Sequence, residues 1–61
     1  MFEINKTYKI KDVEGIHYTA TILEETEDHI SFLDFNGEKQ GLRKEDIAKW
    51  KQIENSTEGE Q

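Results

Sequence analysis

Apolar and polar side chains alternate along this chain in several short runs, and this pattern constrains the fold more than any other. The alternation has the period of two that is typical of strands with one buried face. It covers residues 7–11, and it covers residues 16–23, where one face holds Ile16, Tyr18, Ala20 and Ile22. Residues 2–4 alternate likewise, with a bend expected at residues 5–6. Residues 7–11 and 16–23 each predict a short β-strand, and residues 2–4 lie just before the first of them.

A third run, residues 29–35, has apolar side chains on both faces and is followed directly by Asn36-Gly37. Asn-Gly between two strand-like runs is a strong hairpin signal, because a type I′ turn needs positive φ at both residues. Residues 38–42 are therefore the expected return strand. Gly41 within it predicts a bulge or a sharp bend. The two-faced apolar pattern of residues 29–35 indicates a central strand or a face that carries a site.

The remaining segments are turns and one ambiguous run. Gly15 predicts a turn after the first strand, residues 24–28 form an acidic connection, and residues 43–46 predict a single helical or 3₁₀ turn. In residues 47–53 the apolar side chains lie three positions apart, which suits a helix as well as a strand. We favour a strand, because it would pair with the first strand and close a barrel.

Five short strands in a chain of 61 residues predict one small all-β domain, a five-stranded antiparallel barrel over residues 1–53. Residues 54–61 contain no apolar side chain and are expected to be a disordered acidic tail. The chain has no cysteine, which excludes a disulfide scaffold and a zinc ribbon. No signal peptide or membrane-spanning run is present, so we expect a soluble cytoplasmic protein.

The residues that carry these strands resemble a Tudor-type SH3-like barrel. The resemblance runs from about residue 11 to 47 and rests on Tyr18-Thr19-Ala20-Thr21-Ile22 and on the run from Ile30 to Gly37. It implies an aromatic cage for a methylated Lys or Arg side chain, with Tyr18, Phe32 and Phe35 at cage positions. The alternative is that Tyr18 and Phe32 are core residues, which leaves Phe35 as the better candidate for an exposed contact.

The same strands are also similar, more weakly, to Sm-like barrels, a family that forms rings and binds single-stranded RNA. This resemblance rests on Tyr18-Thr19-Ala20 and on Asp28-His29-Ile30-Ser31-Phe32.

The chain shows no catalytic constellation, so we expect a protein that is not an enzyme and that uses no cofactor or metal. No activated nucleophile, phosphate-binding glycine loop or metal-binding motif is present. His17 and His29 are expected on the surface, where pairing of their strands could bring them near each other and, with Asp28 or Glu27, form a weak metal site.

Charge is distributed unevenly along the chain, and it suggests where a partner would bind. The net charge is -6, yet residues 12–38 contain eight acidic side chains and no Lys or Arg. We therefore expect a binding module that recognises a basic protein segment through an acidic and aromatic surface. Its candidate contact residues are Tyr18, Phe32, Asp34 and Phe35.

Two other functions stay open. One is nucleic-acid binding through a basic strip with a stacking ring, made of Lys39, Arg43, Lys44, Lys49, Trp50 and Lys51. The simpler interpretation of this strip is that Trp50 plugs one end of the barrel and the lysines are solvated. The other is an acidic inhibitor that mimics the charge of DNA.

Overall fold

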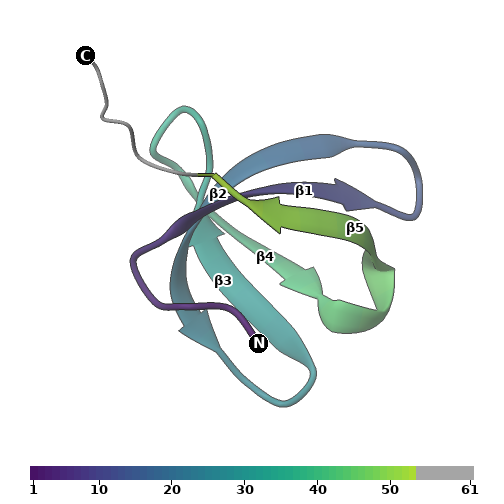
Figure 1. Ribbon diagram of the computed structural model, residues 1–61, viewed down its shortest axis with the longest axis horizontal. Coiled ribbons are helices and arrows are strands. Elements are labelled where there is room, and N and C mark those ends of the chain that lie inside the picture. Colours follow the sequence, from purple (N-terminus) through teal and green to yellow (C-terminus); the bar gives the residue numbers. More distant parts are fainter. Residues whose placement is uncertain (54–61) are drawn as a thin grey trace.

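The computed structural model describes residues 1–53 and consists of one antiparallel sheet (Figure 1). Its elements are β1 (Thr7–Asp12), β2 (His17–Glu25), β3 (His29–Leu33), β4 (Lys39–Arg43), the 3₁₀ turn η1 (Lys44–Asp46) and β5 (Ile47–Gln52). The five predicted strands and the 3₁₀ turn are confirmed, and the ambiguous last run is a strand. The prediction of a disordered tail concerns residues 54–61, which lie outside the described residues.

The strand order is β4-β3-β2-β1-β5, with every neighbouring pair antiparallel. The last strand pairs with the first, as predicted. The sheet curls strongly (Figure 1) but does not close, because β4 and β5 are its two edges and do not pair with each other. The expectation of a closed barrel is therefore wrong for the described residues. The physical reason lies in η1, which directs β5 to the far side of β1 instead of back along β4.

The core lies on the concave face of the curled sheet and is formed by every second side chain along the strands. Its buried apolar side chains are Phe2, Tyr8, Ile10, Ala20, Ile22, Ile30 and Phe32. The alternation in the sequence predicted most of this set. Ile16 is an exception, since it precedes β2 and remains half exposed.

Strand register is irregular at two places, and neither is the predicted one. One bulge lies in β2 between Ile22 and Glu24, and the other between β1 and β5 near Lys11 and Asp12. Gly41 lies in a regular part of the ladder, opposite Ser31. The prediction of a bulge at Gly41 is therefore wrong.

The hairpin between β3 and β4 also differs from the predicted type I′ turn. Among the described residues only Asn5 adopts positive φ without being glycine, so Asn36 does not have the conformation that type I′ demands. Gly37 alone is left-handed, with φ of 81°. The result is a three-residue loop in which a type I turn is followed by a glycine bulge. Asp34 favours this turn because its carboxylate accepts hydrogen bonds from the loop backbone.

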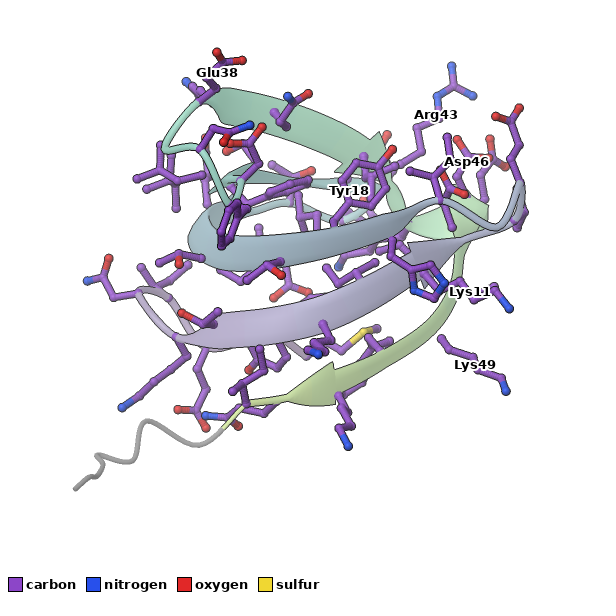
Figure 2. All side chains as sticks on the ribbon, turned by 90° about the horizontal axis from the view of Figure 1, so that it is seen from above. Lys11, Tyr18, Glu38, Arg43, Asp46 and Lys49 are labelled. Atoms are coloured by element: carbon purple, nitrogen blue, oxygen red, sulfur yellow. The ribbon has the colours of Figure 1, made fainter. Side chains whose placement is uncertain are left out.

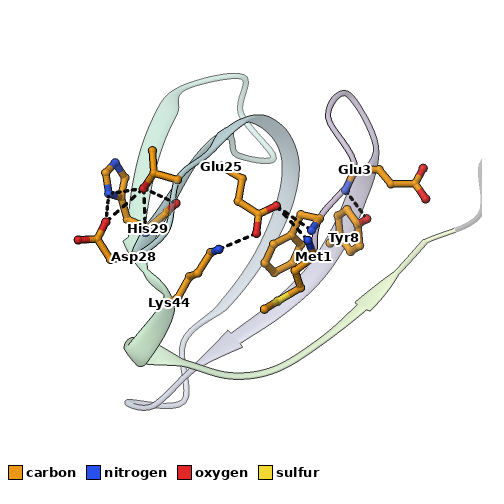
Figure 3. Close-up of polar contacts among 9 residues, drawn as sticks. Met1, Glu3, Tyr8, Glu25, Asp28, His29 and Lys44 are labelled. Carbon is orange, nitrogen blue, oxygen red and sulfur yellow. Dashed lines mark hydrogen bonds and ion pairs between the residues drawn. The ribbon is translucent and has the colours of Figure 1, made fainter.

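A half-buried carboxylate ties three parts of the fold together (Figure 3). Glu25 Oε2 lies 2.6 Å from Lys44 Nζ in η1, and Glu25 Oε1 accepts the backbone N–H of Phe2 at 2.9 Å. The Met1 ammonium lies 3.4 Å from the same oxygen. The hydrogen bond from Lys44 and then that from Phe2 lower the pKa of Glu25 to about 2. Strand β2 thus extends into the acidic segment that was expected to be a connection. Within residues 1–53 no helix has the length or the apolar composition to cross a membrane.

Candidate binding surfaces

The Phe35 loop, residues 34–38, carries the most exposed aromatic side chain among the described residues. Phe35 is 84% exposed at the tip of the β3–β4 hairpin. The loop backbone is held by Asp34, whose Oδ1 accepts the N–H groups of Asn36 and Glu38 at 2.8 and 2.9 Å. Asp34 Oδ2 accepts a hydrogen bond from the Gln40 side chain at 2.9 Å. The loop therefore presents a phenyl ring on a hydrogen-bonded support, with Glu38 on its flank (Figure 2).

Tyr18 and Phe32 lie apart from this exposed ring, on the inner side of the sheet. Phe32 is 0% exposed, and its ring packs against Tyr18 edge to face with a centroid distance of 5.7 Å. Tyr18 is half-buried and donates its phenol O–H to Asp12 Oδ2 at 3.2 Å. Burial, and then this hydrogen bond, raise the pKa of Tyr18. In this arrangement the ring of Phe32 is not available to a ligand. It corresponds to the alternative in which Tyr18 and Phe32 are core residues.

Much of the acidic segment is engaged in the protein's own turns. Asp12, Asp28 and Asp34 each accept hydrogen bonds within a hairpin loop, which lowers the pKa of all three carboxyl groups. The main donors are the Ile16 N–H for Asp12, the His29 ring for Asp28 and the Gln40 amide for Asp34. With Glu25 bound to Lys44, four of the eight acidic side chains of residues 12–38 thus have structural partners.

The predicted basic strip divides between the two opposite edges of the sheet. Lys39 and Arg43 lie on β4, where Arg43 forms an ion pair with Glu45 at 2.8 Å. Lys44 is half-buried and bound to Glu25. Only Lys49, Trp50 and Lys51 lie on β5. The strip is therefore not one continuous surface, and Arg43 lies well apart from Lys49 (Figure 2).

A different basic surface is present on the convex side of β1 and β5, and no single stretch of the sequence indicates it. Lys9 lies directly opposite Lys51, and Lys11 lies directly opposite Lys49. On the other side of β1, Lys11 is opposite His17. We call these five residues the lysine face. They line a shallow open groove of about 370 Å³ together with Ile10 and Trp50. Figure 2 shows Lys11 and Lys49 extending from the outside of this edge.

Trp50 belongs to an aromatic cluster that joins the two ends of the described chain. Its ring lies 5.0 Å from that of Phe2 and 5.7 Å from that of Tyr8, centroid to centroid. Phe2 and Tyr8 are buried, whereas Trp50 is 44% exposed. Trp50 thus covers the core at the β5 edge and keeps part of its ring open to solvent. The sequence showed only that Phe2 and Ile4 alternate with polar residues; residues 2–4 are not a strand, and Ile4 is exposed while Phe2 is buried.

The two histidines lie far from each other along β2 and β3. His17 begins β2 opposite Lys11, whereas His29 begins β3 opposite Arg43, near the other end of β2. His29 Nδ1 contacts Asp28 Oδ1 at 2.9 Å and Thr26 Oγ1 at 3.0 Å (Figure 3). Within residues 1–53, no three His, Cys, Asp or Glu side chains gather closely enough to hold a metal ion. The weak metal site that pairing of these strands suggested is therefore not formed by the described residues.

In comparisons with known proteins, no family model, no curated protein and no solved structure matches the chain.

Proposed function

We propose that this chain is a non-catalytic binding module with the architecture of a Tudor-type SH3-like barrel. Five antiparallel strands, curled around one small core, support this class. A 3₁₀ turn before the last strand, and pairing of that strand with the first, agree with it as well. Small barrels of this kind act through loops and edges, because their interior is filled by side chains.

The partner in this proposal is a basic segment of another protein, and its contact surface is the Phe35 loop. The observation that carries the proposal is the 84% exposure of Phe35 on a loop whose backbone is fixed by hydrogen bonds. Exposed aromatic rings are common anchors of protein interfaces. A loop whose backbone is already held by hydrogen bonds loses little backbone entropy on binding. The neighbouring carboxylates of Asp34 and Glu38 match the charge of a Lys- or Arg-containing segment.

Tyr18 and Phe32 take a supporting part in this proposal. Phe32 packs beneath Tyr18 and fixes the β2–β3 sheet from which the loop extends. Tyr18 is the only member of this pair with exposed surface, so it would contact a partner only at its ring edge. The cation would then lie against Phe35, where a single ring attracts it by about 0.5–1 kcal/mol.

The test is a titration of isotope-labelled protein with Lys- and Arg-rich peptides, followed by NMR. Resonances of residues 34–38 should move, and Phe35→Ala should reduce the affinity about two- to fivefold, which matches the loss of one exposed cation–ring contact. Val13→Ala is the matched control, because Val13 is also exposed, at 61%, in the β1–β2 loop. Unmoved resonances at millimolar peptide, or equal losses in both variants, would contradict the proposal.

A further inference from the structure

We infer that the open edge of β5 binds an extended segment of a partner protein as an added antiparallel strand, with acidic side chains on one face and apolar side chains on the other. This function goes beyond the binding of a basic segment by the Phe35 loop. The inference begins with the position of β5. Within residues 1–53, β5 pairs with β1 on one side and with no strand on the other. The unpaired N–H and C=O groups of an edge strand can bind an extended peptide through main-chain hydrogen bonds.

The backbone groups that face outward on β5 belong to Trp50 and Gln52. The N–H of Ile53 donates to the Thr7 carbonyl at 2.9 Å, so residue 53 faces β1. The register is regular over this part of β5, and the backbone groups of successive residues in an antiparallel strand point to opposite sides. Those of Trp50 and Gln52 therefore point away from β1. In an added antiparallel strand, the residues directly opposite these two would exchange hydrogen bonds with them.

The two faces of β5 differ, and the difference specifies what the added strand carries. On the outer face Lys51 lies opposite Lys9, and Lys49 lies opposite Lys11. Trp50, between the two β5 lysines, lies on the core face and is half exposed. Three consecutive residues thus present a cation, an aromatic ring and a cation on alternate faces. The side chains of an added strand alternate in the same way, so acidic residues would lie beside the lysines and an apolar residue beside Trp50.

The lysines of the outer face have no acidic partner of their own. None of the four forms an ion pair with another residue of the described range 1–53. The residues that pair with β1 on this face from β2 are His17, Thr19 and Thr21. Like charges directly opposite one another destabilise a sheet, whereas opposite charges in that position stabilise it. Acidic side chains on an added strand would lie directly beside Lys49 and Lys51 and offset their repulsion with β1.

Trp50 supplies the apolar half of the recognition. Its ring packs against Phe2 at 5.0 Å and Tyr8 at 5.7 Å between centroids, so it is held at the border of the core. A side chain opposite Trp50 on an added strand would lie on this same face, next to the ring. Pairs of an aromatic and a β-branched side chain stabilise neighbouring strands. A valine or isoleucine in that position would therefore extend the core beyond β5.

The same features disfavour other occupants of this edge. The second edge of the sheet, β4, carries Lys39 and Arg43. Pairing of either edge of a second copy with β5 would therefore bring like charges together. Nucleic acid lying on the lysines would not reach the ring of Trp50, which lies on the opposite face of β5. Residues 54–61 contain glutamates but no apolar side chain to cover Trp50. A partner strand with both kinds of side chain matches all of these features.

The experiment titrates the isotope-labelled full chain with a short peptide in which glutamate alternates with valine, followed by NMR. One control peptide has the same composition, with glutamates and valines in consecutive pairs. A second carries N-methyl groups on its valines, the residues that would lie opposite Trp50 and Gln52. Each control should bind at least about tenfold more weakly than the alternating peptide, since the first cannot match both faces and the second cannot donate its hydrogen bonds.

Two double variants lose the same charge at different distances from the edge: Lys49→Gln with Lys51→Gln on β5, and Lys9→Gln with Lys11→Gln on β1. An added strand would lie about 4.8 Å from β5 and about twice as far from β1. The first variant should weaken binding roughly two- to thirtyfold, as expected for the loss of two cross-strand charge pairs. The second should change it less than about 1.5-fold, because about 10 Å is one Debye length at 0.1 M salt. A ligand lying over the lysine face would lose equally in both.

Amide hydrogen exchange reports the pairing of the backbone. The N–H groups of Trp50 and Gln52 should exchange at least about tenfold more slowly in the saturated complex, whereas that of Lys51, which already faces β1, should change little. Equal protection of all three, or protection of none, would overturn the inference.

The remaining outcomes are equally decisive. Equal losses in the two double variants, equal affinity for either control peptide, or no binding at millimolar peptide would overturn the inference. So would polyglutamate or oligothymidine that binds as tightly as the alternating peptide, which would assign the lysines to a polyanion. NMR spectra of both double variants verify that they remain folded. Phe35→Ala should leave binding of the alternating peptide unchanged, which separates this test from that of the Phe35 loop.

Discussion

Asp12 and Asp34 occupy equivalent positions in two hairpins, and each accepts hydrogen bonds from the equivalent groups of its own loop. In each loop the carbonyl of the aspartate accepts the N–H of the glycine three residues ahead, at 3.0 Å for Gly15 and 2.9 Å for Gly37. Each Oδ1 accepts two further N–H groups, from Glu14 and Ile16 in the first loop and from Asn36 and Glu38 in the second. Each Oδ2 accepts a hydrogen bond from the side chain six residues ahead, Tyr18 or Gln40. One local design thus forms both β1–β2 and β3–β4.

The two aspartates differ in burial, and this difference predicts different costs of removal. Asp12→Ala should lower the Tm more than Asp34→Ala, because Asp12 is buried and its loss leaves the N–H of Ile16 and the half-buried Tyr18 hydroxyl without their acceptor. Asn at either position retains one oxygen and should lower the Tm less than Ala. Thermal unfolding followed by circular dichroism measures the order. A larger loss for Asp34→Ala would contradict it.

Glycine is required in these loops by backbone conformation and not by space. Gly15 and Gly37 have φ of 88° and 81°, and a Cβ added at either would meet nothing within 4 Å. Gly37→Ala should therefore cost about 1–2 kcal/mol of unfolding free energy. Gly41→Ala is the control, because Gly41 lacks positive φ and its Cβ would lie at an ordinary 3.7 Å from the Ile30 carbonyl. It should be neutral or stabilise by about 0.4–1 kcal/mol. Urea unfolding of the two variants and the wild type tests this, and equal costs at residues 37 and 41 would refute it.

Two phenylalanines three positions apart have opposite roles. Phe32→Ala should cost about 3–5 kcal/mol, because it empties the space between Tyr18 and the buried isoleucines. Phe35→Ala should change the unfolding free energy by less than about 0.5 kcal/mol, since the ring lies in solvent. Chemical denaturation compares them directly. Where Phe32→Ala does not fold at all, Phe32→Leu gives a smaller loss of the same sign.

Stability should fall in acid over a defined range. The pKa of Glu25 is lowered from 4.5 to about 2 in the folded protein, so the stabilisation is complete above 4.5 and is lost as the pH falls towards 2. Asp12, Asp28 and Asp34 shift in the same direction. Glu25→Gln should flatten this part of the pH profile, whereas Glu24→Gln, an exposed neighbour with the same charge change, should not. Urea unfolding at intervals between pH 5 and 2 measures it, and a flat wild-type profile would contradict the expectation.

The strands and most of the core could be predicted from the sequence, because both depend on local alternation. The loop geometry could not, although its signal was present: an aspartate three residues before a glycine occurs in both hairpins. The Asn36-Gly37 pair favours a type I′ turn. The hydrogen bonds that Asp34 accepts from the loop backbone outweigh that preference. The end of β2 was likewise missed, because Glu25 is held there by Lys44, which is remote in sequence.

The lysine face could not be found by following charge along the chain. Lys9 and Lys11 are in the first segment and Lys49 and Lys51 in the last, so only the register of β1 against β5 brings them together. The same limit applies to the predicted basic strip, whose members are close in sequence but lie on opposite edges of the sheet. The exposure of Phe35 was predictable because Phe35 directly precedes the turn.

The contact between Phe2 and Trp50 has a consequence for how the chain folds. The rings come from opposite ends of the described residues, and β1 with β5 is the most distant strand pairing in sequence. Closing so large a loop costs chain entropy before any contact compensates for it. Folding rates fall as the mean sequence separation of contacts rises. The hairpins on either side of β2 can form locally, so the indole emission of Trp50 should report the late, rate-limiting joining of the two ends.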